Sequence, residues 1–346
     1  MRFKRKIFIN LGPKFTGRVI ALLLSAVICF GVYQIFLKTA PQVTDTPSED
    51  TSATPTDNNI TTDNIESDSE PSAPPPKEEE VYGIYSTKGS EELGGQISSS
   101  AALLCNNANN TVICRKSECE SISAAPILGL TTALTALNIL SSGTFSPSER
   151  AVCPASAIRL PCYSESSRIL SVGQSLTIAE LIKCMLCTSP EIFAYTLAIH
   201  ISGSEQAFLT HMNDLLSALG TTSTTITSIS DPSTQSTTAM DAAIIFRAAI
   251  ENNTLLGLLS SRESFTVSAS GSAWNTVTLC GRFYSECCTE GQAKADGILC
   301  GYYGEYGGKQ YAFMLFEQLG TKYITVALNS NTAYADSLIL LSRSVN

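Results

Sequence analysis

Few residues in this chain of 346 residues could carry out catalysis. It has two histidines, His200 and His211, so a histidine-based catalytic triad would have to use one of them. Both fall in helical stretches, where we expect ordinary helix residues. The sequence has no G-x-S-x-G motif, no Walker loop and no G-x-G-x-x-G motif. No pattern of histidines and cysteines has the spacing of a zinc site, so we expect no metal and no cofactor.

The twelve cysteines are the other candidate reactive groups. Cys184 and Cys187 have the C-x-x-C spacing of redox sites, but the βαβ context of a thioredoxin-like motif is absent. Cys105 and Cys114 flank a predicted hairpin turn, across which they could face one another. Eleven cysteines follow a predicted membrane segment, and because this number is odd, at least one stays unpaired or pairs between molecules. The sequence leaves the pairing open.

The elements that must position these groups lie within residues 81–346. Residues 98–105 and 111–115 predict a β-hairpin around an Asn-rich turn. Apolar spacing then predicts helices at 130–140, 208–219 and 241–250, the second of which ends at Gly220. A further helix is predicted after a capping box formed by Thr177 and Glu180. The helical period then ends, and strands are predicted at 264–270, 274–280, 295–304, 311–319 and 323–329, followed by a last helix at 332–343. This order predicts an α+β domain with helices packed on a sheet.

The first 80 residues have a different composition. Residues 1–18 carry six basic residues and no acidic one, and residues 19–37 are uncharged and long enough to span a membrane. Residues 38–80 are rich in Thr, Ser, Pro, Asp and Glu, and we expect a disordered stalk. A cleaved signal peptide is the alternative, but the apolar stretch is long for one and no clear A-x-A site follows it. We predict a single-pass cell-membrane protein with a cytoplasmic N-terminus and an extracytoplasmic domain at 81–346.

The charge balance excludes one class of partner. Only 16 of the 22 Lys and Arg residues lie beyond residue 18, whereas all 31 Asp and Glu residues do. A domain this acidic lacks the basic surface that binding to a phosphate backbone requires. We therefore expect no nucleic acid among its partners.

Two segments carry a resemblance to a known family. Residues 170–220 (LSVGQSLTIAELIKCMLCTSPEIFAYTLAIHISGSEQAFLTHMNDLLSALG) and 237–250 (TTAMDAAIIFRAAI) resemble the D-alanyl-D-alanine carboxypeptidases, the low-molecular-weight penicillin-binding proteins of serine-peptidase type. The resemblance extends over about residues 100–345. It implies a transpeptidase/β-lactamase-like fold, an antiparallel sheet sandwiched by helices with a helical subdomain. We expect no β-rich second domain of the kind that many members carry.

The family's three catalytic motifs are altered in this sequence. The resemblance places Pro126 and Gly129 where S-x-x-K has its serine and lysine, and Ser189-Pro190-Glu191 in place of S-x-N. Leu299-Cys300-Gly301 stands in place of K-T-G. No S-x-x-K, K-T-G or K-S-G occurs anywhere, and the one S-x-N is formed by the last three residues. We therefore expect no intact catalytic residue.

The replacements have the residue types of structural positions. Pro126 suits the first turn of a helix, and Ser189, Pro190 and Glu191 suit an N-cap, an N1 proline and an acid facing the helix dipole. A retained catalytic part for Ser189 or Glu191 is the alternative. Cys300 would lie on the strand beside the cleft, either as a packed or disulfide-bonded residue or as a nucleophile. No histidine lies at a family site position to lower the pKa of its thiol.

The sequence supports three hypotheses about function. The first is a membrane-anchored, catalytically inactive carboxypeptidase-like protein that binds peptidoglycan stem peptides or cell-wall enzymes. The second is an active serine-type D-Ala-D-Ala carboxypeptidase, or a related hydrolase, that uses substituted residues. The third is a display stalk whose domain binds nothing specific.

Overall fold

The computed structural model describes residues 83–162, 168–188, 191–270, 276–288 and 297–344. The predicted basic segment, membrane segment and stalk lie outside the described residues, and so do Ser189 and Pro190. Within the described part of the chain, no single helix is long and apolar enough to cross a membrane. The helices Ala239–Glu251 and Asn253–Ser260 pass this test only as a pair, which is bent by 98°.

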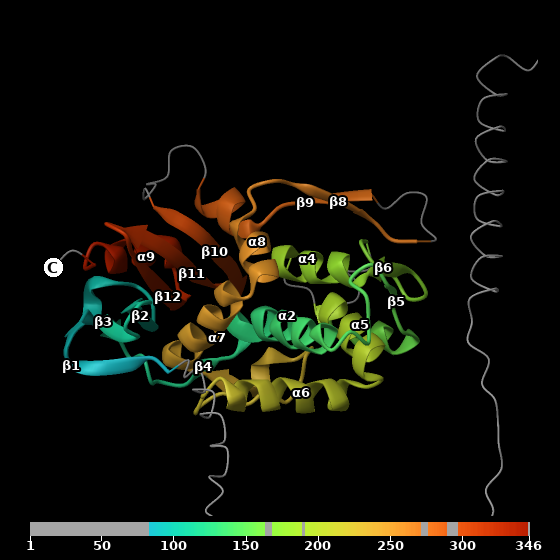
Figure 1. The fold of residues 1–346 in the computed structure, drawn as a ribbon, viewed down its shortest axis with the longest axis horizontal. Helices are drawn as coiled ribbons and strands as arrows, with labels where there is room; N and C mark the ends of the chain where they lie inside the picture. Colours follow the sequence, from blue (N-terminus) through green and yellow to red (C-terminus); the bar gives the residue numbers. More distant parts are fainter. Residues whose placement is uncertain (1–82, 163–167, 189–190, 271–275, 289–296, 345–346) are drawn as a thin grey trace, which may run out of the picture. The chain divides into compact units, whose positions relative to one another are not determined.

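The chain forms helices and strands in the predicted order, arranged as Figure 1 shows. The strands are β1 (Tyr85–Glu92), β2 (Ala101–Asn106), β3 (Thr111–Lys116), β4 (Ile122–Ser123), β5 (Arg150–Val152), β6 (Ser175–Thr177), β7 (Ser236–Thr237), β8 (Phe265–Ser268), β9 (Thr276–Leu279), β10 (Ile298–Tyr306), β11 (Lys309–Gln318) and β12 (Thr321–Ser330). The helices are α2 (Ala125–Ser141), α4 (Ile178–Thr188), α5 (Glu191–Ser202), α6 (Glu205–Ala218), α7 (Ala239–Glu251), α8 (Asn253–Ser260) and α9 (Ala333–Leu341). A π-helical turn, Phe283–Cys287, precedes β10.

Six of the strands form the main sheet, in the order β1-β3-β2-β12-β11-β10. All neighbours are antiparallel except β1, which pairs in parallel with β3. The prediction of an antiparallel sheet is therefore correct for five strands, and β1 was not predicted. Its sequence, YSTKGSEE, has no apolar alternation because almost every residue is exposed at the sheet edge. The predicted strands β8 and β9 form a separate two-stranded ribbon.

Each face of the main sheet is covered by its own hydrophobic core. On one face, Leu103 and Cys105 of β2 belong to the larger core, which includes α2, α4, α5, α6, α7 and α8. On the other face, Ala102 and Leu104 belong to a smaller core with α9. Because successive side chains of a strand point to opposite faces, both must be apolar here. The result is a sheet between helical layers, with the helices α2, α4, α5 and α6 gathered at one side in Figure 1.

Local signals place the helix ends. The capping box is present: the Thr177 N–H donates to Glu180 Oε2 at 2.8 Å, and the Glu180 N–H donates to Thr177 Oγ1 at 3.1 Å. Gly220 follows α6 with a φ of +82°, as expected of a glycine after a helix. The predicted helices at 130–140, 241–250 and 332–343 correspond to α2, α7 and α9. The helical predictions are therefore confirmed.

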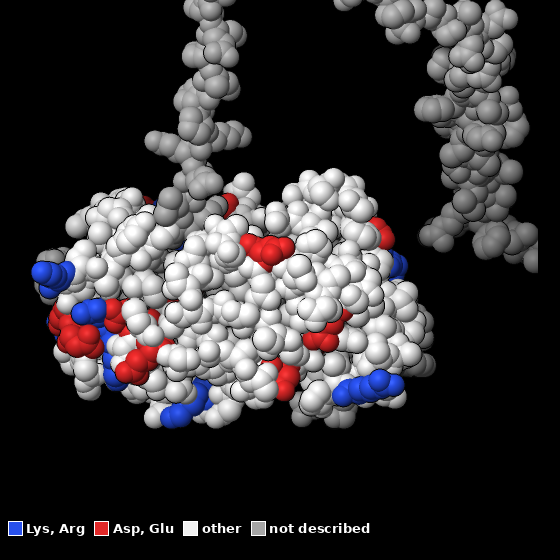
Figure 2. Space-filling view, turned by 90° about the horizontal axis from the view of Figure 1, so that it is seen from below, with Lys and Arg blue, Asp and Glu red and all other residues white. Residues whose placement is uncertain are grey.

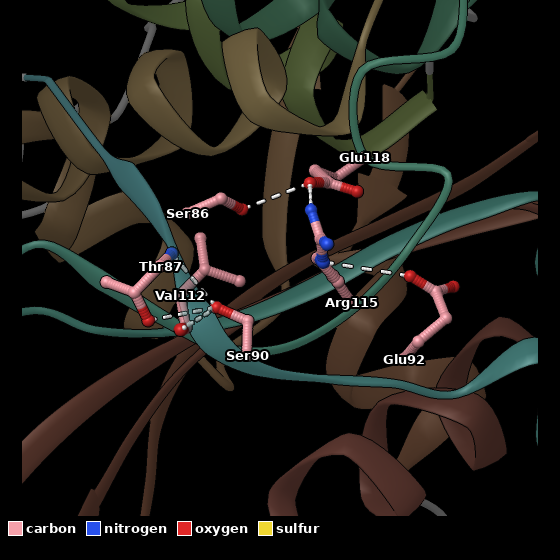
Figure 3. Close-up of polar contacts among 7 residues, drawn as sticks. All are labelled: Ser86, Thr87, Ser90, Glu92, Val112, Arg115 and Glu118. Atoms are coloured by element: carbon pink, nitrogen blue, oxygen red, sulfur yellow. Dashed lines mark hydrogen bonds and ion pairs between the residues drawn. The ribbon is translucent and has the colours of Figure 1, made fainter.

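A polar network fastens the unpredicted strand β1 to the sheet (Figure 3). Ser86 Oγ donates to Glu118 Oε1 at 3.0 Å, and Arg115 contacts the same carboxylate while its Nε lies 3.7 Å from Glu92 Oε2. Burial opposes the ionisation of Glu118, but the hydrogen bonds from Arg115 and Ser86 outweigh it and lower the pKa of this carboxyl group. Side-chain contacts thus hold β1 where apolar burial does not.

The hypothesis that Cys105 faces Cys114 across the hairpin is wrong. In the register of β2 and β3, Leu104 pairs with Cys114 and Cys105 pairs with Val112, with an irregularity between the two pairs. Cys105 points into the larger core and Cys114 into the smaller one. The two thiols lie on opposite faces of the sheet because Leu104 is the residue opposite Cys114, and the side chain of the next residue, Cys105, points the other way.

The surface carries few charges, in keeping with a charged fraction of 15%. Figure 2 shows one face on which uncharged residues cover broad areas. Acidic and basic side chains gather at the end of this view where β1 lies in Figure 1.

Candidate functional site

A cleft of about 80 Å³ lies between the helical subdomain and the edge strand β10. It lies beside the start of α2 and the start of α5. The resemblance places the altered S-x-x-K motif at the start of α2 and the altered S-x-N motif at the start of α5. Its described lining comprises Ala125, Leu128 and Gly129 of α2, Met185 of α4, Glu191 and Ala194 of α5, Ile229 and Pro232 of the loop before β7, and Tyr302, Glu305, Tyr306 and Tyr311 of β10 and β11. We call this space the α2–β10 cleft.

The contact between Gly129 and Tyr302 decides the chemistry of the α2–β10 cleft. A Cβ atom at position 129 would lie 2.7 Å from the hydroxyl oxygen of Tyr302, closer than non-bonded atoms tolerate. Glycine within a helix costs up to about 1 kcal/mol relative to alanine, so it is retained where another group approaches closely. Tyr302 therefore fills the space into which a side chain at position 129 would extend.

Tyr302 is held rigidly in this position. It is 3% exposed, and its ring packs with those of Tyr311 and Phe313 at centroid distances of 5.7 and 6.0 Å. Burial raises the pKa of Tyr302 well above its ordinary value, and the neighbouring Tyr311 adds to the effect. The phenol therefore stays protonated at neutral pH and cannot act as a general base.

Pro126 has the structural position that was predicted for it. It lies in the first turn of α2, where a missing N–H leaves no helical hydrogen bond unmade. Its side chain is buried, and it is not among the described residues that line the α2–β10 cleft. A proline at this position has no hydroxyl and offers no nucleophile.

Of the predicted motif at 189–191, the structure describes only the last residue. Glu191 begins α5, where its carboxylate suits the helix dipole, and it also lines the α2–β10 cleft. The proposed N-cap Ser189 and N1 residue Pro190 lie outside the described residues. The structure therefore brings Glu191 and Gly129 together in one cleft.

The segment Leu299-Cys300-Gly301 lies on β10, as expected, but none of its residues is among the described residues of the cleft lining. Cys300 is fully buried, and burial raises the pKa of its thiol to about 12. A thiol with this pKa is not ionised at neutral pH, so Cys300 lacks the thiolate that nucleophilic attack requires. A Cβ on Gly301 would lie 2.5 Å from ring carbons of Phe283, which explains the glycine by packing.

The other candidate groups also have structural environments. Burial raises the pKa of Cys184 and of Cys187 on α4 to about 12, which does not suit a reactive C-x-x-C site. His200 on α5 lies with Nε2 3.0 Å from Glu149 Oε1, and His211 is exposed on α6. In the described part of the chain, no group of three His, Cys, Asp or Glu side chains is arranged to hold a metal ion.

Sequence reasoning missed the residues that β10 and β11 contribute to the cleft. Tyr302 and Tyr306 lie on the same face of β10 because they are four positions apart, and every second residue of a strand points to the same face. A signal was available in GYYGEYGG (301–308), where three tyrosines are interspersed with glycines. Position 304 is glycine because a Cβ there would lie 2.2 Å from the hydroxyl oxygen of Tyr311.

Comparison with known proteins yields one family match. The model of the D-alanyl-D-alanine carboxypeptidase family matches residues 86–305, which is more than half of the chain. No curated protein matches the sequence.

Many solved structures have a similar fold. A peptidoglycan synthesis regulatory factor from Streptococcus pneumoniae is 20% identical, with 72% of this chain and 74% of that chain covered and a TM-score of 0.60. A D-alanyl-D-alanine carboxypeptidase from Mycobacterium tuberculosis is 18% identical, with 71% and 89% covered and a TM-score of 0.58. Penicillin-binding protein D2 from Listeria monocytogenes, in the ampicillin-bound form, is 20% identical, with 72% and 98% covered and a TM-score of 0.58. These likenesses establish the fold.

Proposed function

Because the chain belongs to the D-alanyl-D-alanine carboxypeptidase family, we propose that it is a catalytically inactive member that binds peptidoglycan stem peptides or cell-wall enzymes. The proposal includes a single membrane helix at residues 19–37, a cytoplasmic N-terminus and an extracytoplasmic domain. The uncharged length of that segment and its basic flank support this placement.

The observation that carries the proposal is the contact between Gly129 and Tyr302. Acyl transfer by a serine peptidase needs a hydroxyl or thiol nucleophile and a base that removes its proton. The described lining of the α2–β10 cleft contains no Ser, Thr, Cys, Lys, Arg or His. The space beside Gly129 is filled by a protonated, buried phenol. The described lining thus offers neither a serine or cysteine nucleophile nor a lysine or histidine base, which supports a binding role over catalysis.

Covalent labelling tests whether activity is lost. The full-length chain in a mild detergent is incubated with excess benzylpenicillin, and its intact mass is compared with that of an untreated sample. An active member of the family serves as the positive control. We expect no mass increase. An adduct of one penicillin would overturn the inactivity, and peptide mapping would then show whether Ser189, Cys300 or another residue carries it.

Cosedimentation with purified peptidoglycan tests the binding role. Tyr306 lies at the cleft and is 39% exposed, whereas Tyr85 is 54% exposed on β1. We expect the wild-type chain to cosediment, Tyr306→Ala to cosediment less, and the matched Tyr85→Ala variant to behave as the wild type. Absence of cosedimentation by the wild-type chain would contradict binding to peptidoglycan itself. An equal effect of both substitutions would contradict the assignment of binding to the cleft.

A further inference from the structure

Two cysteines outside the α2–β10 cleft lie close together in the fold. Cys187 is in the last turn of α4, and Cys280 directly follows β9. Both residues are partly exposed, whereas Cys184, three positions earlier on α4, is fully buried in the larger core. An oxidant in solution can therefore reach Cys187 and Cys280 but not Cys184.

The packing of α4 against the two-stranded ribbon of β8 and β9 brings these two cysteines together (Figure 1). The Nζ atom of Lys183 lies 5.6 Å from the centroid of the Phe265 ring, a contact that joins α4 to β8. Phe265 pairs with Leu279 in the register of the ribbon, so the end of β9 lies beside this contact. Cys187 is one helical turn beyond Lys183, and Cys280 is one residue beyond Leu279. The fold thus places Cys187 against the end of β9.

A cavity of about 210 Å³ lies between the same elements. Its lining includes Lys183 and Cys187 of α4, and also Phe265 and Gly281, the residue after Cys280. A narrower space of about 20 Å³ is also lined by Cys187 and Gly281. A disulfide requires the two Cβ atoms to lie within about 3.5–4.5 Å of each other. The open space allows the two side chains to turn toward one another without displacing core atoms.

The two thiols also interact electrostatically. Burial raises the pKa of Cys187 to about 12, and Cys280 contributes to the rise because two thiolates side by side would repel. Lys183 acts in the opposite direction. A thiol that is hard to ionise is a poor leaving group, so a disulfide that must release Cys187 is reduced slowly.

We propose that Cys187 and Cys280 form a disulfide bond that fastens the end of α4 to the ribbon of β8 and β9 when a small-molecule disulfide oxidises them. The Cys280 thiolate attacks one sulfur of the oxidant, which forms a mixed disulfide and expels one thiolate. The Cys187 thiol then loses its proton and attacks the Cys280 sulfur, which expels the second thiolate. The two cysteines lose two electrons and two protons, and the oxidant takes up both and becomes two thiols.

The bond would fix a ribbon that is separate from the main sheet. Two strands are marginally stable by themselves, so such a ribbon depends on its attachments. At one end, the Ser270 N–H donates to Ser175 O at 3.0 Å and joins the ribbon to β6. The disulfide would add a covalent attachment at the opposite end, where the chain continues to the π-helical turn and β10. Oxidation should therefore stabilise the domain, whatever the α2–β10 cleft binds.

Oxidation of the folded, full-length chain in a mild detergent tests the proposal. The reduced protein, at low concentration and about pH 8, is incubated with glutathione disulfide, and the remaining thiols are blocked with N-ethylmaleimide. Trypsin digestion without reduction, followed by mass spectrometry, should yield a cross-linked pair of peptides, 184–247 and 263–282, that separates on reduction. Cys187→Ala and Cys280→Ala should each abolish this pair, and the matched control Cys184→Ala should keep it.

Thermal unfolding of the same samples measures the effect of the bond. We expect the Tm of the oxidised wild type to lie at least about 5 °C above that of the reduced protein. The same treatment should leave the Tm of Cys187→Ala unchanged.

Three outcomes would contradict the proposal. Pairing of Cys187 or Cys280 with another cysteine or between molecules, or no loss of either thiol, would overturn the assignment of the bond. A bond between the two residues without a rise in Tm would overturn its fastening role. An equal rise in Cys187→Ala would attribute the stabilisation to another disulfide. None of these outcomes bears on the proposed binding function, which the cosedimentation experiment tests separately.

Discussion

Two kinds of carboxylate distinguish two regions of this molecule. Asp336 of α9 is 2% exposed, and its oxygens accept bonds from the Ser99 N–H at 2.7 Å and from the Ser99 and Ser330 hydroxyls at 2.6 Å each. Ser98 donates to the same carboxylate through its N–H and its hydroxyl. These bonds join the start of α9 to the segment before β2 and to the end of β12.

Asp241 of α7 is a second buried carboxylate with several partners. It accepts bonds from the N–H groups of Thr222 and Ser223 and from the hydroxyl of Thr224 at 2.7 Å. Its own N–H donates to the side chain of Thr238, the N-cap of α7. The T-T-A-x-D pattern of the sequence is thus explained by a helix cap and a loop attachment.

The α2–β10 cleft is the opposite case. Glu191 and Glu305 lie at its surface, and none of the described residues bonds to their side chains. Because a buried polar group without a partner is costly, the fold satisfies its inner carboxylates with its own donors. An accessible carboxylate can remain without a partner and is free to bind another molecule. Asp336 and Asp241 therefore stabilise the fold, whereas Glu191 and Glu305 do not.

Replacing Asp336 by alanine should give the largest effect. The change removes the acceptor for the buried donors of Ser99 and Ser330, and we expect a loss of about 3 kcal/mol in the free energy of unfolding. Chemical denaturation of the full-length chain measures it. Asp214→Ala, at an exposed position of α6, is the control and should change stability by less than about 0.5 kcal/mol. Equal losses of stability in the two variants would contradict the structural role of Asp336.

Acid should also lower the free energy of unfolding, because it protonates Asp336. Burial opposes the ionisation of Asp336, but the hydrogen bonds from Ser330, Ser99 and Ser98 outweigh it, so that its pKa lies below the ordinary 3.8. A pKa that is lower in the folded state stabilises the fold above the pKa of the unfolded state. This contribution is lost as the pH falls below about 3.8 and through the lower folded value.

Urea unfolding at a series of pH values from 6 to 2 measures the acid effect. We expect the free energy of unfolding of the wild type to fall below about pH 4. Asp336→Asn, which cannot ionise, should show a shallower decline, and the exposed Asp214→Asn should keep the wild-type slope. The same slope in all three proteins would contradict the assignment to Asp336. Glu118, whose pKa is also lowered, supplies part of the decline that remains.

A smaller loss of stability is expected from a substitution at Gly129, where α2 contacts Tyr302. Alanine usually stabilises a helix relative to glycine by up to about 1 kcal/mol. Gly129→Ala should instead destabilise the chain by about 1–2 kcal/mol, because the new Cβ clashes with the Tyr302 hydroxyl. Gly257→Ala in α8 is the matched control, since no atom lies within 4 Å of its Cβ, and it should be neutral or stabilising.

The double variant Gly129→Ala/Tyr302→Phe sharpens this test. Removing the hydroxyl gives the Cβ room, so the double variant should be less destabilised than the sum of the two single variants. Denaturant unfolding of all four proteins gives the coupling between the two positions. A coupling of zero would show that Tyr302 does not fill the space beside Gly129.

The smallest effect on stability is expected from the cleft carboxylates. The double variant Glu191→Gln/Glu305→Gln should unfold within about 0.5 kcal/mol of the wild type, because no described residue forms a salt bridge with either carboxylate. Loss of more than 1 kcal/mol, by the same unfolding measurement, would place these residues with Asp336 among the structural carboxylates.

Much of the fold could be predicted because its signals are local. The capping box of Thr177 and Glu180 and the glycine after α6 act within a few residues. The continuous apolar runs of the main strands reflect a sheet that is buried on both faces. Strand β1 could not be predicted, because its position depends on Glu118 and Arg115, which lie far along the chain.

The sequence by itself predicted an α+β domain of the carboxypeptidase family, and it predicted that the three catalytic motifs are replaced. It could also show that Cys300 has no histidine at a family site position. Only the tertiary structure shows which side chains surround these positions. The burial of Cys300 keeps its thiol protonated, the Tyr302 hydroxyl occupies the space beside Gly129, and Glu191 lies in the same cleft as Glu305. The physical reason is that burial, steric exclusion and the charge of a cleft depend on distances between side chains, which only the folded chain defines.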